Sequence, residues 1–89
     1  MAQQRVSIKK AYDNTVCNFN NLMDGKITPD NAQYISENIL RVQDMIRMQG
    51  YTVGDINHRR LGKLLRMYDH VWNFMRTGTV ATERFSSNV

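Results

Sequence analysis

Apolar residues recur along three stretches of the chain with alternating steps of three and four residues. The stripes are Ile8, Tyr12, Thr15, Phe19 and Leu22; Ala32, Ile35, Ile39, Val42 and Ile46; and Leu61, Leu64, Tyr68, Val71 and Met75. This spacing places the residues of each stripe on one side of a helix, where they can be buried against other helices. No stretch alternates with a period of two, so the pattern predicts three helices and no sheet.

Glycine, proline and capping residues indicate where these helices begin and end. Thr28 and Pro29 are typical of a helix start, Asp55 can cap the third helix, and a glycine follows each helix. The predicted helices cover 6–23, 29–48 and 56–76, and their short connections favour antiparallel packing of consecutive helices. We therefore expect a single all-α domain over 1–89, a three-helix bundle. Its tail, 79–89, is expected to be flexible, although Phe85 could fold back onto the bundle.

Composition and charge narrow the functional classes. The chain has 89 residues and a net charge of +4, which favours an anionic partner. Cys17 is the only cysteine, which excludes an intramolecular disulfide, and beside Val16 and Phe19 it is predicted to be a buried structural thiol. The N-terminal segment lacks the apolar stretch of a signal peptide, and no segment is apolar enough to span a membrane. A cytoplasmic protein without membrane contact is expected.

The third predicted helix carries the main candidate binding surface. On a helical wheel, Lys63, Arg66 and His70 fall within about 40° of Arg59, forming a basic row. The helix contains no glutamate, although a solvated helix face without a partner is often charged as well. The residues predicted to contact an anionic partner, chiefly nucleic-acid phosphates, are Arg59, Arg60, Lys63, Arg66 and His70, with Lys9 and Lys10 as a second patch.

An apolar flank beside this row supports a different interpretation. Ile56, Met67 and Phe74 widen the apolar arc to about half the helix circumference, with Leu65 and Trp72 assigned to the core. The tail could cover this flank, or it could form a homodimer contact or a protein-binding patch beside the arginines. Gly62 is unusual because a glycine inside a helix costs roughly 0.5–1 kcal/mol relative to alanine. It either admits a partner's backbone or is a tolerated surface residue.

Catalytic and metal-binding patterns are missing from the sequence. His58 and His70 have no cysteine or carboxylate cluster at metal-ligand spacing, and no glycine-rich phosphate loop occurs. A non-enzymatic protein without metal or cofactor is therefore expected. The size, charge and helical pattern are similar to those of small phage-encoded regulators and accessory proteins, but no motif identifies a family. Three hypotheses remain. The first is a regulatory module that contacts nucleic acid through the third helix, the second is a regulator or inhibitor that binds an acidic protein surface, and the third is a purely structural subunit of an oligomer.

Overall fold

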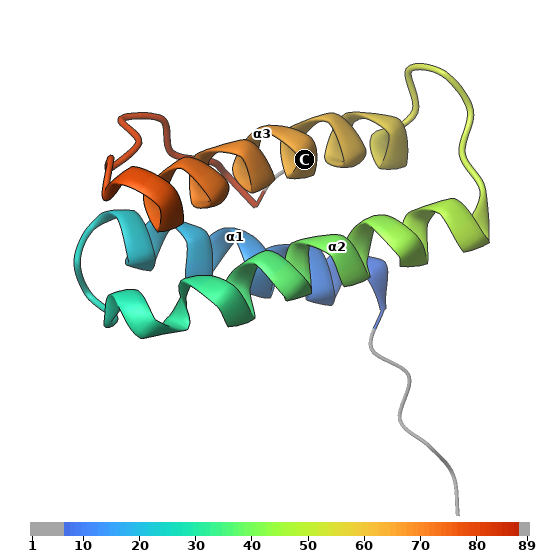
Figure 1. Ribbon diagram of the computed structural model, residues 1–89. Helices are drawn as coiled ribbons and strands as arrows, with labels where there is room; N and C mark the ends of the chain where they lie inside the picture. The colour runs from blue at the N-terminus through green and yellow to red at the C-terminus, as the bar shows by residue number, and fades with distance from the viewer. Residues whose placement is uncertain (1–6, 88–89) are drawn as a thin grey trace, which may run out of the picture.

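The computed structural model describes residues 7–87, which form three long helices and one short 3-10 turn. The elements are α1 (Ile8–Met23), η1 (Pro29–Asn31), α2 (Ala32–Gln49) and α3 (Ile56–Thr77). Consecutive helices run in opposite directions, and the chain after α3 turns back along the bundle (Figure 1). Residues 7–87 contain no strand, so the predicted all-α three-helix bundle is confirmed.

The helix boundaries follow from local capping. The Ser7 hydroxyl accepts a hydrogen bond from the Lys10 amide at 3.1 Å, which starts α1. Asp55 caps α3 as predicted, because its carboxylate accepts the His58 amide at 2.7 Å. At the other end of α3, Gly78 adopts a left-handed conformation with φ of 75°, which glycine tolerates best.

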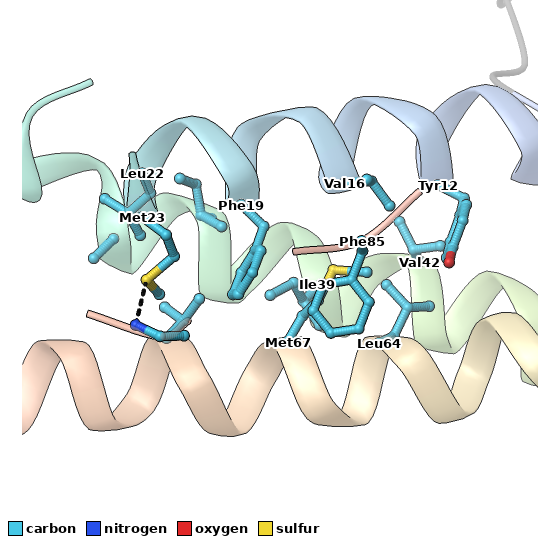
Figure 2. Close-up of a cluster of buried hydrophobic side chains, with 14 of the residues drawn as sticks. Tyr12, Val16, Phe19, Leu22, Met23, Ile39, Val42, Leu64, Met67 and Phe85 are labelled. Carbon is cyan, nitrogen blue, oxygen red and sulfur yellow. Dashed lines mark hydrogen bonds between the residues drawn. The ribbon is translucent and has the colours of Figure 1, made fainter. Parts of the chain in front are cut away.

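Helix α2 forms the centre of the core. All five apolar positions predicted for this helix are buried, and α2 packs against both α1 and α3. The side chains of Phe19, Leu64 and Met67 meet between the helices (Figure 2). Phe85 closes the side of the core between α1 and α3, with its ring edge-on to Phe19 at a centroid distance of 5.3 Å.

Helix α3 is rotated relative to the prediction. Met67, assigned to the apolar flank that the tail or a partner could cover, is fully buried, and Arg60 retains only 7% of its accessible surface. Leu65 and Trp72, assigned to the core, remain 50% and 47% exposed. The surface assignment of Arg60 and the core assignments of Leu65 and Trp72 were therefore wrong, whereas the burial of Met67 agrees with the alternative that the tail covers the flank. The physical reason is that apolar side chains occupy both edges of the arc, and α1 together with the tail covers the edge that carries Met67.

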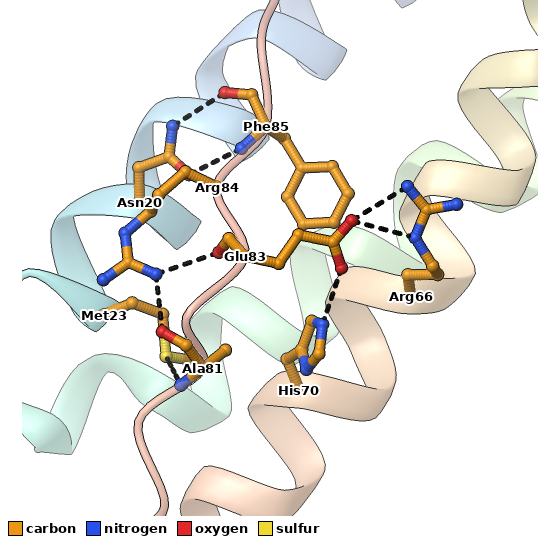
Figure 3. A network of polar contacts seen from close by, with 8 residues as sticks. All are labelled: Asn20, Met23, Arg66, His70, Ala81, Glu83, Arg84 and Phe85. Carbon is orange, nitrogen blue, oxygen red and sulfur yellow. Dashed lines mark hydrogen bonds and ion pairs between the residues drawn. The ribbon is translucent and has the colours of Figure 1, made fainter.

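The C-terminal tail, residues 80–87, packs against the bundle through Ala81 and Phe85. The Asn20 side chain binds the Phe85 backbone twice, donating to its carbonyl at 2.9 Å and accepting its amide at 3.2 Å (Figure 3). Nearer α3, the Ala81 amide donates to the Met23 sulfur at 3.3 Å. The expectation that Phe85 folds back is confirmed, whereas residues 88 and 89 lie outside the described part of the chain.

The sequence also predicted the burial of Cys17 and the absence of a membrane-spanning segment. Cys17 is exposed, which contradicts its predicted burial; it follows the buried Val16 and is turned about 100° away from it around the helix. Its sulfur accepts the Asn21 amide group at 3.6 Å. Within residues 7–87, no helix has the length and apolar content needed to cross a bilayer.

Candidate nucleic-acid interface

An open hollow of about 530 Å³ lies on the N-terminal half of α3. The residues that line it are Tyr51, His58, Arg59, Leu61, Gly62, Lys63, Leu65 and Arg66. Three of these residues are cationic, and no carboxylate is among them. We call this surface the Gly62 hollow. Its composition suits a ligand that is negatively charged and has a flat or apolar part.

Gly62 leaves this hollow open. Apart from its two chain neighbours and the adjacent backbone of its own helix, a methyl group built onto its Cα would meet no described atom within 4 Å. The glycine therefore makes room for no other part of the described chain, although it costs roughly 0.5–1 kcal/mol of helix stability relative to alanine. In the folded chain, Gly62 leaves this position on the surface of α3 without a side chain.

Two aromatic rings border the hollow. Tyr51, in the connection between α2 and α3, stacks on His58 with a centroid distance of 5.7 Å and an interplanar angle of 13°. The His58 ring is also held by a hydrogen bond, because its Nδ1 accepts the Gly54 amide at 2.9 Å. The Tyr51 ring is still 42% exposed. The connection thus presents a fixed aromatic surface beside the cations.

Asp55 stabilises this connection. Its carboxylate accepts the Thr52 amide at 2.9 Å and the His58 amide at 2.7 Å. These hydrogen bonds, that from Thr52 first, lower the pKa of Asp55 below its ordinary value. The ionised cap therefore holds both the connection and the first turn of α3 in place.

Arg59 and Lys63 are the cations of the hollow that have no acidic partner within residues 7–87. Arg59 is exposed, and its Nε donates to the Gly54 carbonyl at 3.4 Å. Lys63 is partly exposed one turn further along α3. Both charges are available to an anionic ligand.

Glu83 of the tail neutralises the other half of the predicted basic row (Figure 3). Its carboxylate lies 3.0 Å from Arg66 Nη2 and 2.9 Å from His70 Nε2. The hydrogen bond to His70, then that to Arg66, lowers the pKa of Glu83, against the effect of burial. The Arg66 guanidinium also lies 5.4 Å from the centre of the Phe85 ring. The four residues of the basic row therefore share one face of α3, but Glu83 contacts two of them and leaves the other two available to a ligand.

Arg60 does not belong to the surface, which corrects its predicted role. Its Nη1 donates to Asn57 Oδ1 at 3.0 Å, and its guanidinium carbon lies 5.5 Å from the centre of the Tyr12 ring. Burial raises the pKa of Tyr12, which keeps this phenol neutral. Arg60 thus links α1 to α3 inside the bundle.

The predicted second patch, Lys9 and Lys10, lies on α1. Lys9 pairs with Asp13 at 2.8 Å and also donates to the Ser87 carbonyl at 3.2 Å, which ties the tail to α1. Lys10 is exposed. Neither lysine lines the Gly62 hollow.

The predicted apolar flank does not exist as one surface. Ile56 is 47% exposed at the first turn of α3, Met67 is fully buried, and Phe74 is partly buried against the core. The exposed apolar residues of α3 that the sequence assigned to the core are Leu65 and Trp72. Since both edges of the arc are apolar, the periodicity alone contained no signal for their exposure.

The chain matches no protein-family model, no curated protein and no solved structure in the comparisons. Within residues 7–87, no three histidine, cysteine or acidic side chains come together as a metal site would require.

Proposed function

We propose that this protein is a non-enzymatic module that binds nucleic acid through the Gly62 hollow. The observation that carries the proposal is that three cations and a stacked aromatic pair, of which Tyr51 is exposed, line an opening whose lining contains no carboxylate. Arg59 and Lys63 contact phosphates, and Tyr51 offers its ring to a base. Phosphate contacts supply affinity and orientation without reading the base sequence.

The aromatic surface favours single strands over duplex. Base stacking on an aromatic side chain requires an unpaired base, and it contributes about 1–3 kcal/mol per base. Every base has a flat face, so this contact tolerates many sequences. The proposal is thus a basic, weakly sequence-selective binder whose preference for single strands depends on Tyr51.

The test is a titration of labelled single-stranded and duplex oligonucleotides, followed by fluorescence anisotropy between about 50 and 200 mM salt. Because each phosphate contact releases counterions, Arg59→Ala and Lys63→Ala should each reduce the salt slope by roughly one unit. Tyr51→Ala should weaken single-stranded binding more than duplex binding. Arg41→Ala and Lys26→Ala are matched controls, because they remove exposed charges away from the hollow.

Two results contradict the proposal. The first is no binding to either nucleic acid at low salt, which is the outcome expected if the partner is an acidic protein surface. The second is an equal loss of salt slope in the Arg41 and Lys26 controls, since that would reflect net charge rather than the hollow.

A further inference from the structure

The C-terminal half of α3 carries an exposed stripe with no partner among residues 7–87. Leu65, Asp69, Trp72 and Arg76 follow one another at steps of four, three and four, which places them on one face of the helix. Leu65 and Trp72 are about half exposed. Asp69 and Arg76 are exposed, and neither forms an ion pair with another described residue.

This stripe is complementary to itself in one orientation. Asp69 precedes Trp72 by three residues, and Arg76 follows it by four. When two copies of α3 cross antiparallel at Trp72, each Asp69 lies opposite the other copy's Arg76, and the two indole rings meet at the two-fold axis. A parallel pair would instead bring like charges together, which is unfavourable.

We propose that a second copy of this chain docks on this stripe and forms an isologous, antiparallel homodimer through α3. In such a dimer the same patch serves both subunits, so every contact occurs twice. The indole and Leu65 supply apolar area, and the reciprocal Asp69–Arg76 pairs set the orientation. This interface uses a different face of α3 from the flank of Ile56, Met67 and Phe74.

The stripe is one helix wide, so the proposed dimer interface is small and its affinity is expected to be low. Interfaces that bury less than about 1,200 Å² in total associate weakly. Exposed ion pairs determine orientation and partner choice more than affinity. The dimer is therefore expected to form reversibly at concentrations on the order of 0.1–1 mM.

The proposed dimer shares one residue, Leu65, with the Gly62 hollow and leaves Arg59 and Lys63 outside the stripe. Gly62 lies ten residues before Trp72, a distance of about 15 Å along the helix. The two-fold axis places both hollows on the same side of the dimer, about 30 Å apart. If the proposed function holds, one nucleic acid can span both sites; the dimer itself does not depend on that function.

The decisive experiment exchanges charges and is run by analytical ultracentrifugation without nucleic acid. Asp69→Arg places two arginines on the stripe and Arg76→Asp places two aspartates there, so each variant alone repels itself. Each should dimerise about tenfold or more weakly than the unmodified chain. An equimolar mixture of the two restores both opposite-charge pairs and should form a heterodimer as tightly as the unmodified chain dimerises. Glu37→Arg, on an exposed position of α2, is the control that should leave dimerisation unchanged.

A second measurement needs no variant. Trp72 is the only tryptophan, so its fluorescence reports on the stripe directly. Dilution of the unmodified chain should shift the emission to longer wavelength as the indole becomes solvated, with a midpoint that matches the ultracentrifugation. A chain that stays monomeric at about 1 mM overturns the proposal, and so does a mixture that fails to associate better than its single components.

Discussion

Gly62→Ala provides the sharpest test of the interpretation of α3. The added methyl group would meet nothing within 4 Å, so the substitution has no steric cost in the folded chain. Alanine is favoured over glycine inside a helix by roughly 0.5–1 kcal/mol, mainly because glycine loses more backbone entropy on folding. For a domain of this size, that gain corresponds to an increase in Tm of roughly 2–8 °C.

The assay is thermal and urea unfolding followed by circular dichroism, with Gly78→Ala as the matched contrast. Gly78 has a φ of 75°, so alanine there is strained and should lower stability by about 1 kcal/mol. The same chemical change should thus have opposite signs at the two positions. A decrease in Tm for Gly62→Ala would refute the reasoning, because it would reveal a folded-state contact at this position.

The same variant separates stability from binding. The methyl group occupies the open surface of the Gly62 hollow, so a ligand that approaches the helix backbone there is pushed away. We expect the stabilised Gly62→Ala protein to bind oligonucleotides more weakly at constant salt. If the affinity is unchanged while Tm rises, the backbone of Gly62 does not contact the ligand.

Three further predictions concern the core and the tail. Leu64→Ala should cost about 2–5 kcal/mol in urea unfolding because Leu64 is fully buried, whereas the half-exposed Leu65→Ala should cost about 1 kcal/mol or less. Phe85→Ala should cost about 3 kcal/mol, since its ring closes the core; a loss below about 0.5 kcal/mol would contradict the packing of the tail. Because the pKa of Glu83 is lower in the folded chain, its contribution to stability is present above the ordinary value of about 4.3 and lost as the pH falls through the lowered value. Glu83→Gln should therefore reduce the acid sensitivity of folding below about pH 4.3, unlike Glu37→Gln, and should strengthen oligonucleotide binding because it removes the carboxylate that pairs with Arg66 and contacts His70.

Local patterns predicted the helices because local interactions determine them. In α2 the apolar residues Ile35, Ile39, Val42 and Ile46 recur at steps of three and four, and the opposite face of the helix is largely polar. Only one face of α2 is therefore suited to burial, and the pattern predicts it correctly. Asp55 was recognisable as a cap because only the next few residues decide that contact. The order of the elements then followed from the short connections.

The rotation of α3 was not predictable in the same way. Met67 and Phe74 on one edge of its apolar arc and Leu65 and Trp72 on the other are equally suited to burial. The choice between them depends on Phe85, which returns from the tail to cover one side. This contact joins segments that are distant in sequence. The tail has no hydrophobic periodicity from which the contact could have been predicted.

The candidate site shows the same limit. The row from Arg59 to His70 was visible on a helical wheel, but its division into a free and a neutralised half was not. Glu83 pairs with Arg66 and His70 only because the tail runs back along the bundle. The charge pattern of one helix therefore identifies side chains that could contact a ligand. Whether these side chains are free to do so depends on which acidic residues the rest of the chain places beside them.

The tail accordingly has consequences for both proposed surfaces of α3. By covering the side that carries Met67, it fixes the rotation that leaves Leu65 and Trp72 in solvent, and the homodimer stripe depends on that exposure. By placing Glu83 on Arg66 and His70, it leaves Arg59 and Lys63, at the Gly62 hollow, as the residues of the basic row without an acidic partner among the described residues. A change that detaches the tail should therefore act on both surfaces. It should leave Arg66 without its acidic partner, and it should remove the packing that fixes the rotation of α3 and keeps Trp72 exposed. Variants such as Glu83→Gln, which remove the carboxylate from Arg66 and His70 while Phe85 stays in the core, separate these two effects.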